Sequence, residues 1–162
     1  MLKKGFTLLE TIVAIGILSL AMTGVFSLAS LSIRSASVSS NQTIAFFLAS
    51  EAIEYIRNIR DSNILAGSGW LTGLVTCQSA NGCYVDVIND MIMGCGAECP
   101  KIKFDPMEKF YNHSIGGDTL FTRQILISNV APDIEVKVIV VMSWQQRTLT
   151  RTFTLENHLF NR

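Results

Sequence analysis

The feature that most constrains this chain is an uncharged, largely apolar run near its start, from Thr11 to Ile33. As a helix these 23 residues would span roughly 34 Å, enough to cross a hydrocarbon core of about 30 Å. Lys3 and Lys4 precede the run, and no comparable basic cluster follows it closely. The positive-inside rule therefore predicts a cytoplasmic N-terminus and an exported remainder.

A cleaved secretory signal would also begin with basic residues and an apolar core. Such a core is about 7–15 residues long and ends at a small-residue cleavage site, whereas this run is longer and continues into a further helical pattern. A membrane anchor fits better, but it leaves Glu10 unexplained, because a carboxylate in a membrane-spanning segment costs a few kcal/mol. One interpretation is local: Thr7 caps the helix and Glu10 completes a capping box in its first turn.

A second interpretation joins Glu10 to the bond between Gly5 and Phe6. The stretch Lys-Lys-Gly-Phe-Thr-Leu-Leu-Glu, followed by a long apolar helix, resembles the N-terminal signal of type IV prepilins and type II secretion pseudopilins. The resemblance implies that prepilin peptidase cuts after Gly5, that Phe6 becomes the methylated N-terminus, and that Glu10 pairs with a neighbouring subunit's N-terminal amine. A buried Glu10 without a cation would cost several kcal/mol. Because Phe6 and Glu10 are four residues apart on a helix, the pair could also form within one chain.

Composition excludes several function classes. The formal charge is zero, and without Lys3 and Lys4 the chain has 11 basic against 13 acidic side chains, so a strongly basic surface for nucleic acid is not indicated. The sequence contains no G-x-S-x-G, no H-E-x-x-H and no phosphate-binding glycine loop, so we expect no catalytic residues, no cofactor and no enzyme activity. We expect His113 and His158, far apart in the sequence, to be surface residues.

Four cysteines lie in the part of the chain that would be exported. An even number of closely spaced cysteines in an oxidising compartment predicts disulfides, with three possible pairings. Local pairing, Cys77 with Cys83 and Cys95 with Cys99, is favoured, and the nested pairing remains open. Zinc is less favoured, because the spacings C-x5-C and C-x3-C differ from paired C-x2-C knuckles, and we expect no metal.

The helical pattern continues beyond Ile33. Charged residues lie on one face, with Glu54 and Asp61 each at pairing distance from Arg57. The chain has no proline before Pro100, so we expect a single helix from about Phe6 to Asn63, its second half packed on a globular head. The apolar residues at spacings of three and four that predict its buried stripe are Ile44, Phe47, Leu48, Ala52, Tyr55, Ile56 and Ile59.

The stretch after the helix is irregular and dense in Gly, Asn and Cys. We expect short strands at Cys83–Val87 and Lys101–Phe104, and Trp70 as a packing anchor beneath the loop. From Phe121 the pattern changes to period two, which predicts antiparallel strands. These strands are Phe121–Ser128, Ile134–Trp144 and Thr148–Leu155, with Val136, Val138, Val140, Met142 and Trp144 on one face.

The sequence therefore predicts an α+β, pilin-like fold. A long N-terminal helix, membrane-spanning in its first half, would pack on a C-terminal antiparallel sheet of 3–4 strands, with a disulfide-bearing loop between them. We expect five regions: leader peptide (1–5), transmembrane and assembly helix (6–33), amphipathic half of the helix (34–63), variable loop with disulfides (64–120) and sheet (121–162).

The resemblance implies a structural subunit, a minor pilin or pseudopilin, whose partners are prepilin peptidase, the cytoplasmic membrane and other filament subunits. It would be a single-pass protein of the cytoplasmic membrane with an exported head, and then part of an extracellular or periplasmic filament. The segment Ala49–Asp61 and the strand containing Val-Met-Ser-Trp look like minor subunits that prime assembly, such as those related to the I-type pseudopilin and its pilus counterpart.

The alternative function is a binding module, an adhesin-like or DNA-capturing tip subunit that the filament delivers. A run that alternates cations with aromatic residues suits single-stranded nucleic acid, but is more often a solvated edge strand, so we do not expect nucleic acid as a partner. That run contains Lys101, Lys103, Phe104, Lys109, Phe110 and Tyr111. Four acidic residues without the EF-hand spacing are a weak calcium signal. They are Asp86, Asp90, Asp105 and Asp118.

Overall fold

The computed structural model describes Gly5 and residues 7–162. Contacts divide the chain into two compact units, Met1–Asn41 and Gln42–Arg162, and the second unit is here called the head. In chain order the elements are α1 (Leu8–Leu65), the short 3-10 helix η1 (Val75–Gln78), β1 (Cys83–Asp86), β2 (Met91–Gly94), β3 (Lys101–Asp105), β4 (Phe110–Asn112), β5 (Gly117–Ala131), β6 (Glu135–Gln146) and β7 (Leu149–Phe160).

Helix α1 is a single element of 58 residues, as the absence of proline predicts. It ends in a Schellman motif, in which the amide of Ser68 donates to the Asn63 carbonyl and the amide of Gly67 donates to the Ile64 carbonyl, both at 3.0 Å. Gly67 has φ of 67°, the left-handed conformation that glycine adopts without a Cβ penalty. The chain therefore leaves the helix two residues later than expected.

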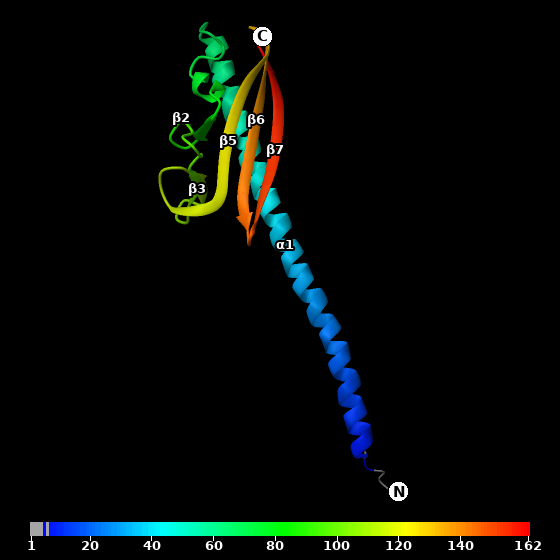
Figure 1. The fold of residues 1–162 in the computed structure, drawn as a ribbon. Helices are drawn as coiled ribbons and strands as arrows, with labels where there is room; N and C mark the ends of the chain where they lie inside the picture. Colours follow the sequence, from blue (N-terminus) through cyan, green and yellow to red (C-terminus); the bar gives the residue numbers. More distant parts are fainter. Residues whose placement is uncertain (1–4, 6) are drawn as a thin grey trace. The chain divides into compact units, whose positions relative to one another are not determined.

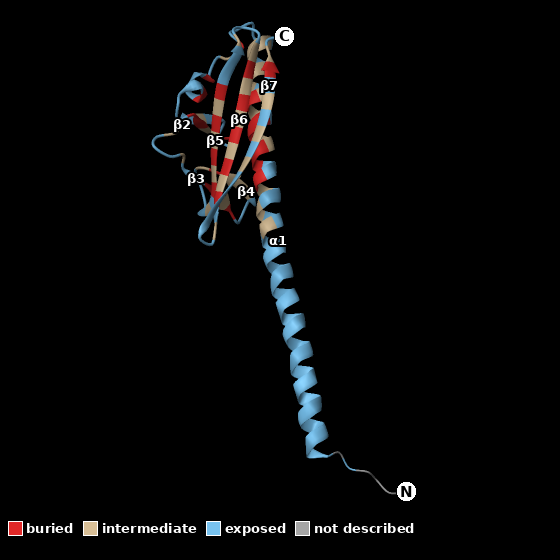
Figure 2. Cartoon of the chain, turned by 45° about the vertical axis from the view of Figure 1, so that its right-hand side comes forward, coloured by how far each residue is buried: buried red, intermediate tan, exposed pale blue. Residues whose placement is uncertain are grey.

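The part of α1 in the head has a buried face (Figure 2), and three of its six buried residues are alanines. Phe47 was expected in the buried stripe, and this is wrong: its side chain is 65% exposed. The expectation followed the large apolar residues, whereas alanines occupy the buried side and let the helix backbone approach the strands closely. The buried residues are Ala45, Leu48, Ala49, Ala52, Ile53 and Ile56.

All seven strands form one antiparallel sheet, which confirms the α+β fold class with a larger sheet than expected (Figure 1). The long strands β5, β6 and β7 lie side by side, with Ile125 opposite Val140 and Val140 opposite Leu155. β1 and β3 pair with the other edge of β5, and the short strands β2 and β4 extend them outward. Strands of three or four residues such as β2 and β4 are too short to show a clear period in the sequence.

The core lies between α1 and the inner face of the sheet. On β6 the alternation is as predicted, with Val136, Val138, Val140, Met142 and Trp144 all buried. Trp70 is 7% exposed and packs in the same core, as expected. Full burial of each Leu, Ile or Val side chain contributes about 1.5–3 kcal/mol. This apolar contact therefore holds the helix on the sheet.

Ion pairs on the outer face of α1 partly follow the predicted spacing. Glu54 and Arg57 pair at 2.6 Å, as expected. Asp61, expected to pair with Arg57, instead pairs with the adjacent Arg60 at 2.7 Å. Arg60 also donates to the Phe160 carbonyl at 3.0 Å, which fastens the end of β7 to the helix.

Candidate functional site

Helix α1 begins with Thr7 as its cap. The Thr7 carbonyl accepts from the amides of Glu10 and Thr11 at 3.1 and 3.2 Å, and the Thr7 hydroxyl accepts from the Glu10 amide at 3.3 Å. Glu10 lies in the first turn, near the positive end of the helix dipole. The Thr7 half of the capping box is thus present, whereas the Glu10 carboxylate is exposed and makes no hydrogen bond to another described residue.

Hydroxyl side chains within the apolar part of α1 bond back to the helix. Thr11 donates to the Leu8 carbonyl at 2.8 Å and Ser19 to the Ile15 carbonyl at 2.8 Å. Further along, the Thr23 hydroxyl donates to the Leu20 carbonyl at 2.7 Å, and the Ser27 hydroxyl donates to the Thr23 carbonyl at 3.0 Å. A polar group satisfied by its own helix does not need water, so these hydroxyls are compatible with lipid.

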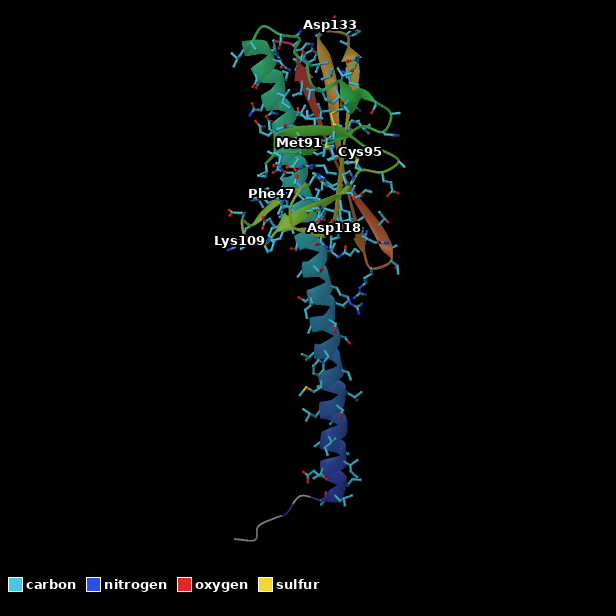
Figure 3. All side chains as sticks on the ribbon, turned by 90° about the vertical axis from the view of Figure 1, so that its left-hand side faces the viewer. Phe47, Met91, Cys95, Lys109, Asp118 and Asp133 are labelled. Carbon is cyan, nitrogen blue, oxygen red and sulfur yellow. A yellow bond between two sulfur atoms is a disulfide. The ribbon has the colours of Figure 1, made fainter. Side chains whose placement is uncertain are left out.

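The apolar side chains of the first unit point outward rather than into a core (Figure 3). Within residues 7–162, α1 is long and apolar enough to cross a membrane, and none of its most apolar window is buried. Gly16 and Gly24 have open space around them, so another helix could approach there closely. The exposed large residues are Leu8, Leu9, Ile12, Val13, Ile15, Ile17, Leu18, Leu20, Met22, Val25, Phe26, Leu28, Leu31 and Ile33.

In the head, Arg123 is a buried cation that the sequence analysis missed. Its side chain on β5 is 3% exposed and donates to the Leu48 carbonyl at 2.8 Å and the Val85 carbonyl at 2.7 Å. It also pairs with Glu51 at 2.7 Å. Burial lowers the pKa of Arg123, and the Glu51 carboxylate opposes this. The guanidinium therefore ties β5 to the helix and to β1.

Asp86 is a second buried polar anchor, 1% exposed at the end of β1. It accepts from the Asn89 side chain at 2.9 Å, the Ser114 hydroxyl at 2.8 Å and the His113 amide at 3.1 Å. Burial alone would raise the pKa of Asp86, but these hydrogen bonds outweigh it and the pKa is lowered. Asp86 thus joins the β1–β2 turn to the segment after β4.

The four aspartates considered for calcium are not gathered at one point. Asp86 is occupied as described, Asp105 accepts from the Met107 amide at 2.8 Å, and Asp90 accepts from the Tyr55 hydroxyl at 2.7 Å. Burial, and then the bond to Asp90, raise the pKa of Tyr55. Among the described residues no group of three or more His, Cys, Asp or Glu side chains could hold a metal ion.

His113 was expected at the surface, and this is wrong for its ring. Both ring nitrogens are buried, and the backbone of Lys101 lies close enough to favour the protonated ring. The ring lies against Tyr84, with 4.7 Å between the centroids and an angle of 50° between the ring planes. Burial, and then the charge of Arg123, lower the pKa of His113 from its usual 6.5 to about 4. His158, in contrast, is exposed and pairs with Glu135.

The run of cations and aromatics forms the β3–β4 hairpin at one end of the sheet order. Phe104 and Tyr111 are cross-strand neighbours with centroids 5.0 Å apart, and both are half-buried. Their rings pack on each other, and Lys109 lies in the exposed turn between the two strands. This is the edge-strand arrangement, with no row of open aromatic faces on which bases would stack.

All four cysteines pair locally. Cys77 bonds to Cys83 and Cys95 to Cys99, each with 4.6 Å between Cα atoms. The first pair is fully buried in the core and the second is half-buried. Each disulfide therefore closes a short loop. The first joins η1 to the start of β1, and the second closes the segment after β2.

Comparison with known proteins bears on the start of the chain. Residues 1–26 match the prokaryotic N-terminal methylation motif. The chain carries a type IV pilin-like prepilin signal. This prepilin signal belongs to structural rather than enzymatic proteins, and in general it implies processing by prepilin peptidase and assembly into pilus filaments. Together with the apolar helix it fits anchoring in a membrane and then a surface filament. No curated protein and no solved structure matches the chain.

Within the prepilin signal, Gly5 and Glu10 are placed, whereas Phe6, Lys3 and Lys4 lie outside the described residues. No cation among the described residues pairs with the Glu10 carboxylate. The prepilin signal therefore presents an acid on an otherwise apolar, exposed helix.

Proposed function

We propose that this chain is a structural subunit, a minor pilin or pseudopilin, that prepilin peptidase cuts between Gly5 and Phe6. The observation that carries the proposal is the prepilin signal over residues 1–26, continued by a helix whose apolar side chains stay exposed. Such a surface is stable only in lipid or against other helices. The head has its own core and would be exported, where oxidising conditions suit its disulfides.

The regions of the chain then have separate tasks. Residues 1–5 are a leader that is removed, and residues 6–33 anchor the subunit in the cytoplasmic membrane and later pack in the filament. Residues 34–63 continue the helix into the head, and the loop region 64–120 and the sheet 121–162 complete the head. The likeness of Ala49–Asp61 to assembly-priming subunits supports the minor group.

Glu10 is the assembly residue in this proposal. Cleavage creates an amine on Phe6 that the uncut chain lacks, and a carboxylate among packed apolar helices needs such a cation, because an unpaired buried charge costs several kcal/mol. A neighbouring subunit's amine would supply the pair. The capping box alone requires no charge, since Gln serves at that position as well as Glu.

The test replaces the charge and keeps the cap. Glu10→Gln, expressed in cells that assemble the filament, should lower the amount of subunit in sheared filaments at least about tenfold, as a loss of 1.4 kcal/mol or more would. Immunoblotting of filament and membrane fractions measures it. The matched control is Glu54→Gln, an exposed glutamate on the same helix, which should assemble normally.

Thr7→Ala distinguishes the two interpretations of Glu10. It removes the cap, at about 1 kcal/mol of helix stability, and leaves the charge. If Glu10→Gln assembled normally and Thr7→Ala did not, Glu10 would be only a capping residue and the assembly role would be wrong.

A further inference from the structure

A groove of about 640 Å³ crosses the face of the sheet that points away from the core. Its floor is formed by residues of β5, β6 and β7 that alternate with the buried ones. One wall is the loop closed by the Cys95–Cys99 disulfide, where Cys95 is labelled in Figure 3. The floor includes Thr122, Gln124, Val141, Ser143, Gln145 and Thr150, and the wall includes Ala97, Glu98, Cys99 and Lys101.

The floor offers hydroxyl and amide groups. Thr122 lies opposite Ser143, and Thr150 lies opposite Gln145. Within the described part of the chain, the hydroxyls of Thr122, Ser143 and Thr150 make no hydrogen bond. The Gln124 amide donates to the Asn81 carbonyl at 3.0 Å, which fixes that side chain in place. Each hydroxyl both donates and accepts, so the floor suits a partner whose groups do the same.

Charge and backbone pairing narrow the class of partner. The lining has one cation, Lys101, and one anion, Glu98, so the groove does not favour phosphates or acidic chains. The backbone groups of the floor are used in the β5–β6–β7 ladders, so an added peptide strand would find no free partners there. What remains for recognition is a cluster of neutral donors and acceptors beside the apolar side chains of Leu120, Val141 and Trp144.

We propose that this groove binds a neutral oligosaccharide. Sugar hydroxyls match the free hydroxyl and amide groups of the floor, and the groove has the size of common ligand sites, about 300–1,000 Å³. The wall is preorganised, because the Cys95 amide bonds to the Gly82 carbonyl at 3.1 Å and the disulfide closes the loop. The proposal concerns the head alone and does not rest on the role of the N-terminal helix.

The test uses the full chain in a detergent without a sugar headgroup, with maltohexaose, cellohexaose and chitohexaose as probes. Threonine methyl groups are followed by NMR. At least one hexaose should bind with a Kd of about 1 mM or tighter and shift Thr122 and Thr150, while Thr76 stays unchanged.

Two variants test the floor. Thr122→Val with Ser143→Ala removes two hydroxyls at nearly constant volume and should weaken binding at least about tenfold. The matched control is Ser128→Ala, which removes a hydroxyl from the outer face of β5 away from the groove and should leave the affinity unchanged. Because these side chains lie on the outer face of the sheet, the fold should survive, as the circular dichroism spectrum and the urea unfolding midpoint will show.

Three outcomes overturn the proposal. The first is that no hexaose shifts the groove threonines. The second is that the double variant binds as well as the unchanged chain. The third is that a sulfated hexaose or a single-stranded oligonucleotide binds the same threonines more tightly than every neutral sugar, since the groove would then select charge.

Discussion

At the scale of single residues, Arg123 shows how a cation serves in an apolar core. It lies in the same phase of β5 as Phe121 and Ile125, and its donors reach the helix and β1. The sequence did contain a sign of this buried cation, because Arg123 occupies a position of β5 that the alternating pattern assigns to the core. Its partner Glu51, 72 residues earlier, was not predictable, because only the packed fold brings them together.

Loss of the guanidinium should destabilise the head strongly. Arg123→Met leaves two buried carbonyls and Glu51 without their donor, so the free energy of unfolding should fall by about 2–4 kcal/mol. Both tryptophans lie in the head, so their emission during urea unfolding of the full chain reports that unit. Arg57→Met, at a more exposed ion pair, should change it by less than about 1 kcal/mol. Equal effects would contradict the anchoring role of Arg123.

His113 should make the head sensitive to mild acid. Its folded pKa of about 4 lies below its usual 6.5, so the unfolded chain binds the proton more readily and stability is lost as the pH falls from 6.5 toward 4. Because the imidazole is only partly buried, solvent screens part of this effect, and we expect a loss on the order of 1–2 kcal/mol. The lowered pKa of Asp86 acts in the same direction, but only as the pH falls below the usual range of a carboxyl.

Urea unfolding at several pH values between 4 and 7 measures this. His113→Phe keeps a ring against Tyr84 and removes the titrating group, so it should flatten the pH dependence above pH 4. His158→Gln, at the exposed histidine, should leave it in place. A slope that persists in His113→Phe would show that another group is responsible.

At the scale of elements, periodicity predicted the long elements and failed on the short ones. The alternation on β6 placed five core residues correctly, because a strand of 12 residues repeats its period several times. The helix was predicted as one piece, but its buried face was rotated, since alanines carry little weight in a hydrophobic stripe. β2 and β4 depend on pairing with β1 and β3 rather than on their own pattern.

The loop before β1 depends on one glycine. Gly82 has φ of 65°, and a Cβ there would collide with the carbonyl oxygen of Ile125. Gly82→Ala should therefore lower the free energy of unfolding by about 2 kcal/mol or more. Gly96→Ala is the matched control, because no atom lies within 4 Å of the added methyl group. Similar effects of the two changes would contradict the close approach of this loop to β5.

The two disulfides should differ in reactivity. Cys77 and Cys83 are fully buried, whereas Cys95 and Cys99 are half-buried in the loop that borders the groove. Since thiol–disulfide exchange needs access to a sulfur, a mild reductant should open Cys95–Cys99 first in the folded chain. Alkylation followed by peptide mapping identifies the order. Simultaneous or reversed reduction would contradict it.

At the scale of the whole molecule, the chain combines a short signal that the sequence reveals with a head whose surface it does not. Gly5, Phe6 and Glu10 lie within a stretch of six residues, so their pattern can be recognised without a fold. The groove is lined by residues from β5, β6, β7 and a disulfide-closed loop, so no local sequence pattern predicts it. The two units of the chain differ in the same way. The unit that contains the prepilin signal has an exposed apolar helix, and the head has a closed core.

The central claim is that this subunit is processed at its prepilin signal before it joins a filament. The most direct test is intact mass and N-terminal fragment analysis of the subunit isolated from the cells that produce it. We predict a chain that begins Phe6-Thr7-Leu8 and carries one methyl group on its terminal amine. A mature chain that still begins at Met1, or that is cut beyond the apolar helix, would contradict it.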